Sequence, residues 1–60
     1  MIYDKIKELC DKKGIPIYKL EKEAGLGNGT IGGWQTSSPT VDSLKAVARV
    51  LGVKASKLID

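Results

Sequence analysis

The chain has 60 residues, of which ten are Lys or Arg and seven are Asp or Glu, so its formal net charge at pH 7 is +3. A chain of this length forms one small core, and 42% hydrophobic residues indicate a folded domain and exclude a disordered segment. With no His and a single Cys, the chain offers neither a zinc finger nor an intrachain disulfide, and a reducing cytoplasm is the expected setting.

Apolar residues at helical spacing predict a first helix over residues 2–13. Its inner face carries Ile2, Ile6, Leu9 and Cys10, and charged residues occupy the other faces. Gly14 then suits the C-cap at which such a helix ends. A buried, unreactive thiol is a commoner role than a nucleophile for a cysteine such as Cys10 on an apolar helix face.

A second helix is expected to begin near Pro16, because proline suits the first position of a helix, and to end at Gly25. Its inner face carries Ile17, Leu20 and Ala24, which recur at spacings of three and four residues.

A third, short helix is predicted over residues 28–35, with Ile31 and Trp34 packed inward. Local propensity opposes this helix, since each interior Gly costs about 1 kcal/mol relative to Ala and the segment holds three glycines. The dipeptide Asn28-Gly29 also favours a turn, so a turn in place of a helix stays open for this segment.

Thr40 follows a proline-containing loop and provides an N-cap for a fourth helix, which Gly52 ends. The inner stripe of this helix consists of Val41, Leu44, Val47, Ala48 and Leu51. A final short helix over residues 55–59 is expected to place Leu58 and Ile59 on the core.

Several function classes find no support in the sequence. Residues 24–41 are uncharged, but five glycines, one proline and many hydroxyls make them too polar to span a bilayer. Residues 27–32 match G-x-G-x-x-G, yet a dinucleotide site also needs a preceding strand and a sheet. With no His and only scattered acidic residues, catalysis has little to build on. We expect no enzyme, small-molecule substrate, metal, cofactor or membrane association.

The glycine break at residues 24–26 lies between two short helical patterns. Two helices joined by a short turn that contains Gly are the layout of the helix-turn-helix, whose second helix enters the major groove of DNA. The motif would cover residues 17–35. An isoelectric point near 9.2 is compatible with a nucleic-acid partner, although most single lysines on small domains are solvated surface.

A wider series of residues extends this pattern over nearly the whole chain: Gly14-Ile15, Leu20, Ala24-Gly25-Leu26, Thr30-Ile31, Trp34, Pro39-Thr40, Leu44, Ala48, Leu51-Gly52-Val53 and Leu58. In this series the chain resembles the Cro/C1-type (XRE-like) helix-turn-helix family of phage and bacterial transcriptional repressors. The resemblance implies a small all-α, five-helix, lambda-repressor-like domain over residues 1–60. It also implies binding to double-stranded operator DNA, usually as a homodimer, in order to regulate transcription.

The resemblance also implies which positions face DNA. Those that face the bases are Ile17, Asn28, Gly29, Gly32 and Gly33, and those near the DNA backbone are Thr30, Thr36 and Ser37. Tyr18 and Lys19, at the start of the second helix, could reach a phosphate. The chain departs from the family pattern because glycines stand where Ser, Arg or Lys are common. Asn28 is then the one outer side chain able to make a bidentate contact, for which Asn prefers adenine.

Glu21 occupies a position where the family often has a small residue. We expect its carboxylate to lie over Gly27 or Gly29 and to accept hydrogen bonds from amides at the start of the third helix.

The absence of charge from residue 25 to residue 41 leaves a second function open. The same fold would then serve as a protein–protein interaction module, such as an antirepressor or adaptor, with weakened base recognition. Leu58 and Ile59 are candidates for a dimer seam, and packing of both residues onto the first helix is the plainer alternative.

Overall fold

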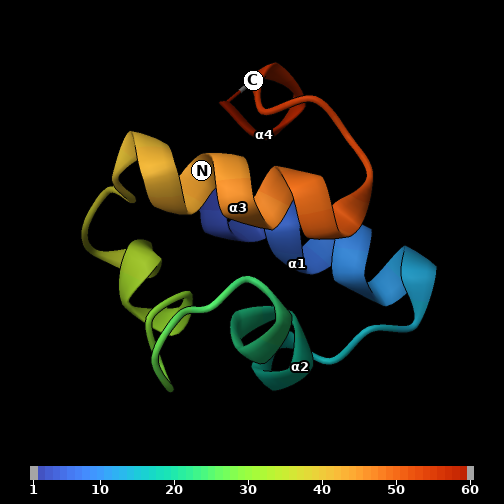
Figure 1. Cartoon of the computed structure of the whole chain (residues 1–60), viewed down its shortest axis with the longest axis horizontal. Helices are drawn as coiled ribbons and strands as arrows, with labels where there is room; N and C mark the ends of the chain where they lie inside the picture. The colour runs from blue at the N-terminus through green and yellow to red at the C-terminus, as the bar shows by residue number, and fades with distance from the viewer. Residues whose placement is uncertain (1, 60) are drawn as a thin grey trace.

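Five helical segments follow one another through residues 2–59, the part of the chain that the computed structural model describes. They are α1 (Ile2–Lys13), α2 (Ile17–Glu23), the 3-10 helix η1 (Gly32–Gln35), α3 (Val41–Leu51) and α4 (Ser56–Ile59) (Figure 1). Within that range there are no strands. The all-α class is therefore confirmed, with four α-helices and one 3-10 turn in place of five α-helices.

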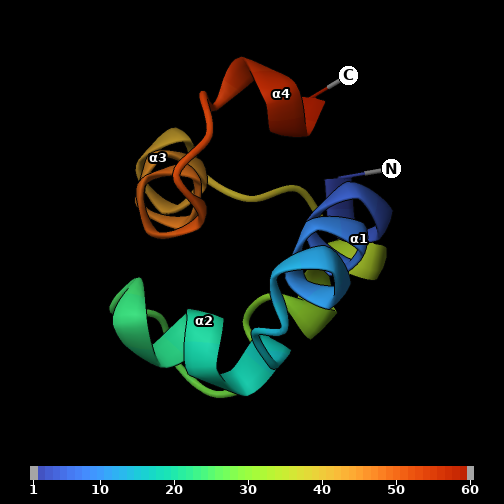
Figure 2. The same cartoon turned by 90° about the vertical axis from the view of Figure 1, so that its right-hand side faces the viewer.

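The elements surround one core. Helix α1 packs against η1, α2 and α4, and α2 packs against α3. In Figure 2 the view runs nearly along α3, with α1 beside it, α2 below and α4 above. The fully buried side chains between them come from the four α-helices and from the turn before η1: Ile6, Cys10, Leu20, Ile31, Val47, Leu51 and Leu58.

The prediction for α1 is confirmed at both ends. The helix covers the expected residues, and Gly14 follows it with a left-handed φ of 69°. Cys10 is 1% exposed. Burial raises the pKa of its thiol, and the neighbouring Asp11 carboxylate adds to this effect, so Cys10 is a protonated core residue.

The ends of α3 also follow the prediction. The Thr40 hydroxyl accepts a hydrogen bond from the Ser43 amide at 3.1 Å, and Gly52 ends the helix with φ 72°. The prediction that Val41 faces the core is wrong, because its side chain is 66% exposed. The first turn of α3 extends past α1 and α2 in Figure 1, so neither helix covers it.

Two smaller expectations need correction. Pro16 has extended backbone angles and precedes α2, so it is the N-cap and not the first helical residue. In α4, Leu58 lies in the core but Ile59 is 65% exposed, because one short helical turn buries a single side of the helix. Because Leu58 is buried, it is not available for the dimer contact that the sequence suggested. Ile59 does not pack onto the core, contrary to the expectation.

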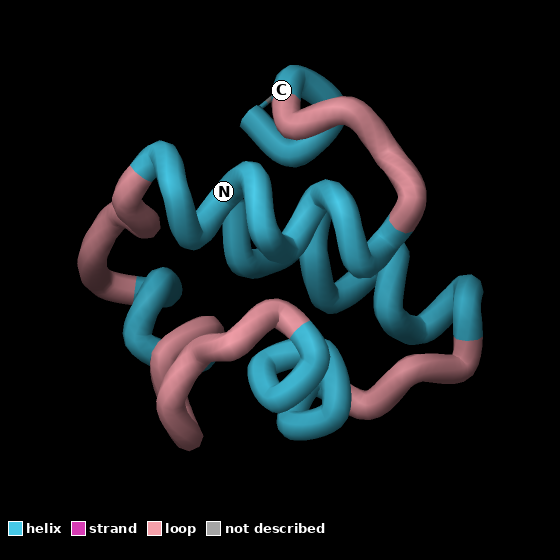
Figure 3. The backbone as a smooth tube through the Cα atoms, in the orientation of Figure 1, coloured by secondary structure: helices cyan, strands magenta, loops and turns pink. Residues whose placement is uncertain are grey.

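The third predicted helix differs most from the expectation. Residues 28–31 form turns, and only Gly32–Gln35 is helical, as one 3-10 turn (Figure 3). Gly29 has a φ of 81°, which a right-handed helix does not accommodate. A helix beginning at residue 28 is therefore interrupted at its second residue, and the turn that Asn28-Gly29 favoured is present.

Glu21 explains why this turn is stable. Its side chain is 4% exposed, and its two carboxylate oxygens accept hydrogen bonds from the Gly29 amide at 3.2 Å and the Ile31 amide at 2.8 Å. The expected contact between Glu21 and the third segment is confirmed. Both amides are satisfied by a side chain from α2, so the turn needs no helical hydrogen bonds at these residues.

We predict that Glu21→Gln destabilises the domain and loosens the turn. The neutral amide keeps one acceptor, but its NH2 group faces a backbone donor, which leaves a buried amide without a partner. The expected loss is about 1–2 kcal/mol of unfolding free energy. In a domain of this size that lowers the Tm by roughly 4–8 °C per kcal/mol.

The matched control is Glu23→Gln, which removes the same charge from an exposed position on the same helix. Thermal unfolding followed by circular dichroism measures both variants. Equal melting temperatures for the two would show that the Glu21 hydrogen bonds do not stabilise the fold.

Candidate nucleic-acid interface

The residues that sequence analysis assigned to DNA lie on three segments. Ile17, Tyr18 and Lys19 form the first turn of α2, residues 28–33 form the turn and the start of η1, and Thr36 and Ser37 follow η1. In Figure 1, α2 and the turn occupy the lower edge of the molecule, and η1 with its following loop continues up the left side. Helix α4 lies at the opposite edge.

Asn28 is the polar side chain that the turn presents to solvent. It is exposed, and its amide group makes no hydrogen bond to other residues in the 2–59 range. The next residue, Gly29, is held through its amide by Glu21. Asn28 therefore carries a free donor and a free acceptor beside a fixed point of the backbone, which is what a bidentate contact to a base requires.

Gly32 and Gly33 give the start of η1 a surface without side chains. Neither has a positive φ, and a Cβ atom added at either position would meet no atom within 4 Å. Glycine is therefore required at neither position by backbone angle or by crowding. The effect of the two glycines is to expose the backbone itself, so that another molecule could approach it closely.

Thr36 and Ser37 are fastened to the end of η1. Their hydroxyls donate to the carbonyl oxygen of Gly33 at 3.3 and 2.9 Å, and their backbone amides donate to the same oxygen at 3.2 and 3.1 Å. This convergence on Gly33 was not predicted from the sequence, although two hydroxyl residues just after a short helix are a signal for it. A hydroxyl has one proton to donate, so either residue would exchange its bond to Gly33 for a bond to a phosphate oxygen.

The first turn of α2 supplies exposed groups of another kind. Tyr18 is 68% exposed and Lys19 is exposed, whereas Ile17 is partly buried and packs against the core. Tyr18 and Lys19 also line a shallow hollow with Lys22 and Glu23. A phenol and two ammonium groups on this face can donate to phosphate oxygens.

Electrostatically the interface is weak. Residues 24–41 contain no charged side chain, so the turn and η1 offer only amides, hydroxyls and carbonyl groups. Positive charge comes from Lys19 and Lys22 on α2, and Glu23 offsets part of it. Thr30, at the centre of the turn, is partly buried, and its amide is bonded to the Gly27 carbonyl at 3.2 Å.

Residues 2–59 offer neither a metal site nor a membrane-spanning helix. No group of three or more His, Cys, Asp or Glu side chains is placed to hold a metal ion in that part of the chain. None of its helices has both the length and the apolar character to cross a membrane.

Comparison with known proteins places these elements in a family. A family model described as helix-turn-helix matches residues 6–58, which include all of α2, the turn, η1 and α3. Comparisons with curated proteins and with solved structures gave no match. Since the family model covers most of the chain, the protein belongs to the Cro/C1-type (XRE-like) helix-turn-helix family of DNA-binding regulators.

Proposed function

We propose that the protein binds double-stranded DNA sequence-specifically and represses transcription by occupying its operator, as a phage or prophage-like repressor. Membership of a DNA-binding family supports the choice of ligand. The observation that supports base recognition is the exposed, unpaired amide of Asn28 on a turn that Glu21 holds in place. A turn whose backbone is already held in place loses little conformational freedom when it binds.

In this mechanism residues 28–35 approach the major groove. Asn28 makes a bidentate contact to adenine, and the bare backbone at Gly29, Gly32 and Gly33 lies close to the base edges, with Ile17 beside them. The contacts to the sugar-phosphate backbone come from the surrounding polar groups: Tyr18, Lys19, Thr30, Thr36 and Ser37. Such a repressor works in the cytoplasm, where Cys10 stays reduced.

A homodimer would bridge two half-sites about one helical turn of DNA apart. Ile59 supports this part of the proposal, because it is a large aliphatic side chain that is 65% exposed. Pairing of this residue between two copies would remove its surface from water.

One observation favours a second function. Between residues 25 and 41 there is no charge, and the segment that reads DNA in this family is here mostly turn. A neutral, glycine-rich surface also suits contact with another protein, so the alternative is an antirepressor or adaptor on the same fold. Selection for a DNA motif separates the two functions.

We predict that selection from a random duplex library at physiological salt recovers a two-fold symmetric motif that contains adenine. With Asn28→Ala, the preference for adenine at one position in each half-site is lost, and affinity for the selected site falls by about 1–3 kcal/mol. The Tm of the variant is unchanged, because the Asn28 side chain makes no internal hydrogen bond. A folded protein that recovers no motif would favour the interaction module.

We predict that Gly33→Ala affects stability and DNA binding in opposite directions. The added methyl group meets no atom within 4 Å and the backbone angle is ordinary, so the free energy of unfolding rises by about 0.5–1 kcal/mol. Affinity for the selected site falls, since the methyl group separates the backbone from the DNA. Calorimetry and a binding titration measure the two effects, and undiminished affinity would show that Gly33 does not approach DNA closely.

We predict that Ile59→Asp abolishes self-association. Light scattering over a range of concentrations should show the wild-type mass rising from the monomer value of 6.4 kDa towards twice that value. The Ile59→Asp variant should stay at the monomer value. Val41→Asp is the matched control, because Val41 is exposed to a nearly identical extent at the start of α3. The same mass distribution for wild type and Ile59→Asp would rule out this seam.

A further inference from the structure

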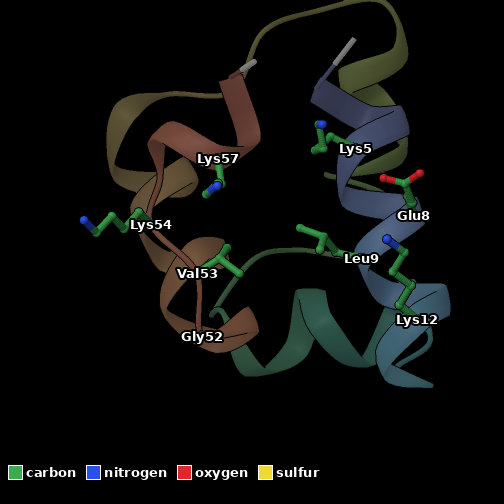
Figure 4. Close-up of a pocket in the computed structure, with 8 residues that line it drawn as sticks. All are labelled: Lys5, Glu8, Leu9, Lys12, Gly52, Val53, Lys54 and Lys57. Carbon is green, nitrogen blue, oxygen red and sulfur yellow. The ribbon is translucent and has the colours of Figure 1, made fainter.

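A groove that the proposed DNA contacts do not use lies between α1 and the segment after α3. Its volume is about 530 Å³, and it is lined by Lys5, Glu8, Leu9, Lys12, Gly52, Val53, Lys54 and Lys57. Figure 4 shows Leu9 and Val53 reaching towards each other from the two walls, with Lys57 beside Val53 and Lys54 directed outward. Both apolar side chains are partly buried against the core, which leaves part of each exposed in the groove.

The charge of the groove differs from that of the rest of the molecule. Four lysines and one glutamate line it, whereas the whole chain has ten basic and seven acidic residues. The remaining residues are therefore six basic and six acidic, so the net charge of +3 is concentrated at the groove.

None of these lysines is neutralised within the described chain. An ion pair joins Lys7 to Asp11 at 3.7 Å on α1, and no carboxylate of residues 2–59 lies within 4 Å of the ammonium group of Lys5, Lys12, Lys54 or Lys57. Glu8 is at the rim of the groove, but it does not pair with a lysine. The groove therefore combines uncompensated positive charge with a partly exposed apolar pair.

We propose that this groove is a docking site for an acidic segment of a partner protein, with an apolar side chain seated between Leu9 and Val53. Carboxylates on either side of that side chain would pair with Lys5, Lys12 and Lys57. The volume of the groove suits a few side chains, and its charge is complementary to an acidic peptide. This site is independent of the proposed DNA contacts.

Duplex DNA fits the groove less well than an acidic peptide. A sugar-phosphate backbone would pair with the lysines but would leave the apolar pair without a partner, and Glu8 would repel it. The groove also lies away from the turn, which is at the lower left of Figure 1, whereas residues 52–57 (orange to red) are at the upper right. The domain could therefore hold DNA and an acidic partner at the same time.

The test uses a short fluorescent peptide of Asp and Glu with one central Leu, titrated with the full chain and followed by anisotropy. We expect saturable binding with a Kd below about 1 mM, which is the range of weak, transient contacts. Replacing the peptide's Leu by Ser should weaken binding at least about three-fold, because the apolar contact is lost. A peptide with Lys in place of its acidic residues should not bind.

Two lysines at the end of α1 provide a matched pair of variants. Lys12 lines the groove and the adjacent, equally charged Lys13 does not, while both are exposed in the last turn of α1. Lys12→Gln should weaken peptide binding by about two- to five-fold, and Lys13→Gln should leave it unchanged. If Lys12→Gln and Lys13→Gln weakened peptide binding equally, the binding would be general electrostatic attraction and the proposal would be overturned.

Amide shifts in NMR spectra locate the bound peptide and decide between peptide and DNA. The proposal requires that the peptide shift the amides of residues 5–12 and 52–57, and that a duplex shift those of residues 28–37 without displacing the peptide. A duplex that shifts the groove amides and competes with the peptide would make the groove a phosphate-binding surface. Absence of peptide binding while DNA is still bound would overturn the docking site and leave the proposed function intact.

Discussion

The two hydrogen bonds that the Glu21 carboxylate accepts from backbone amides are the interaction on which the proposed DNA-contacting turn depends. A charge that is 4% exposed is costly to bury unless it is well bonded, and both of its oxygens are bonded here. The partners lie eight and ten residues further along the chain, so one side chain fixes how the turn sits on α2. Ile31, one of the two donors, is fully buried in the core, and η1, which follows it, packs against α1.

Local signals in the sequence were sufficient where an element is determined by its own residues. The bounds of α1, the Thr40 cap and the glycine stops at residues 14 and 52 follow from periodicity and capping alone. Local signals failed where a contact with a residue distant in the sequence determines the backbone conformation. At Asn28-Gly29 the turn is stabilised over a helix because backbone amides of this segment donate hydrogen bonds to Glu21 on α2, a contact that local propensity does not include.

The misplaced apolar residues have a common cause. Val41 lies at the start of its helix and Ile59 near the end of its own, and both fit the apolar pattern of their elements. The spacing of apolar residues identifies the apolar face of a helix. How much of that face is buried depends on how far the neighbouring helices extend along it. For the candidate site, the assignment of Asn28 and the glycines to DNA stays a prediction. The sequence did not predict that both loop hydroxyls donate to the Gly33 carbonyl.

The open space around Gly32 and Gly33 has an evolutionary consequence. A Cβ atom at either position would meet no atom within 4 Å, so a side chain can begin there without a compensating change in the core. A single mutation could then give the protein a new hydrogen-bonding group on the proposed DNA-contacting surface while its fold is retained. Divergence of specificity among copies of such a gene would therefore be rapid at these positions, and slow at Glu21, where any change disturbs the turn.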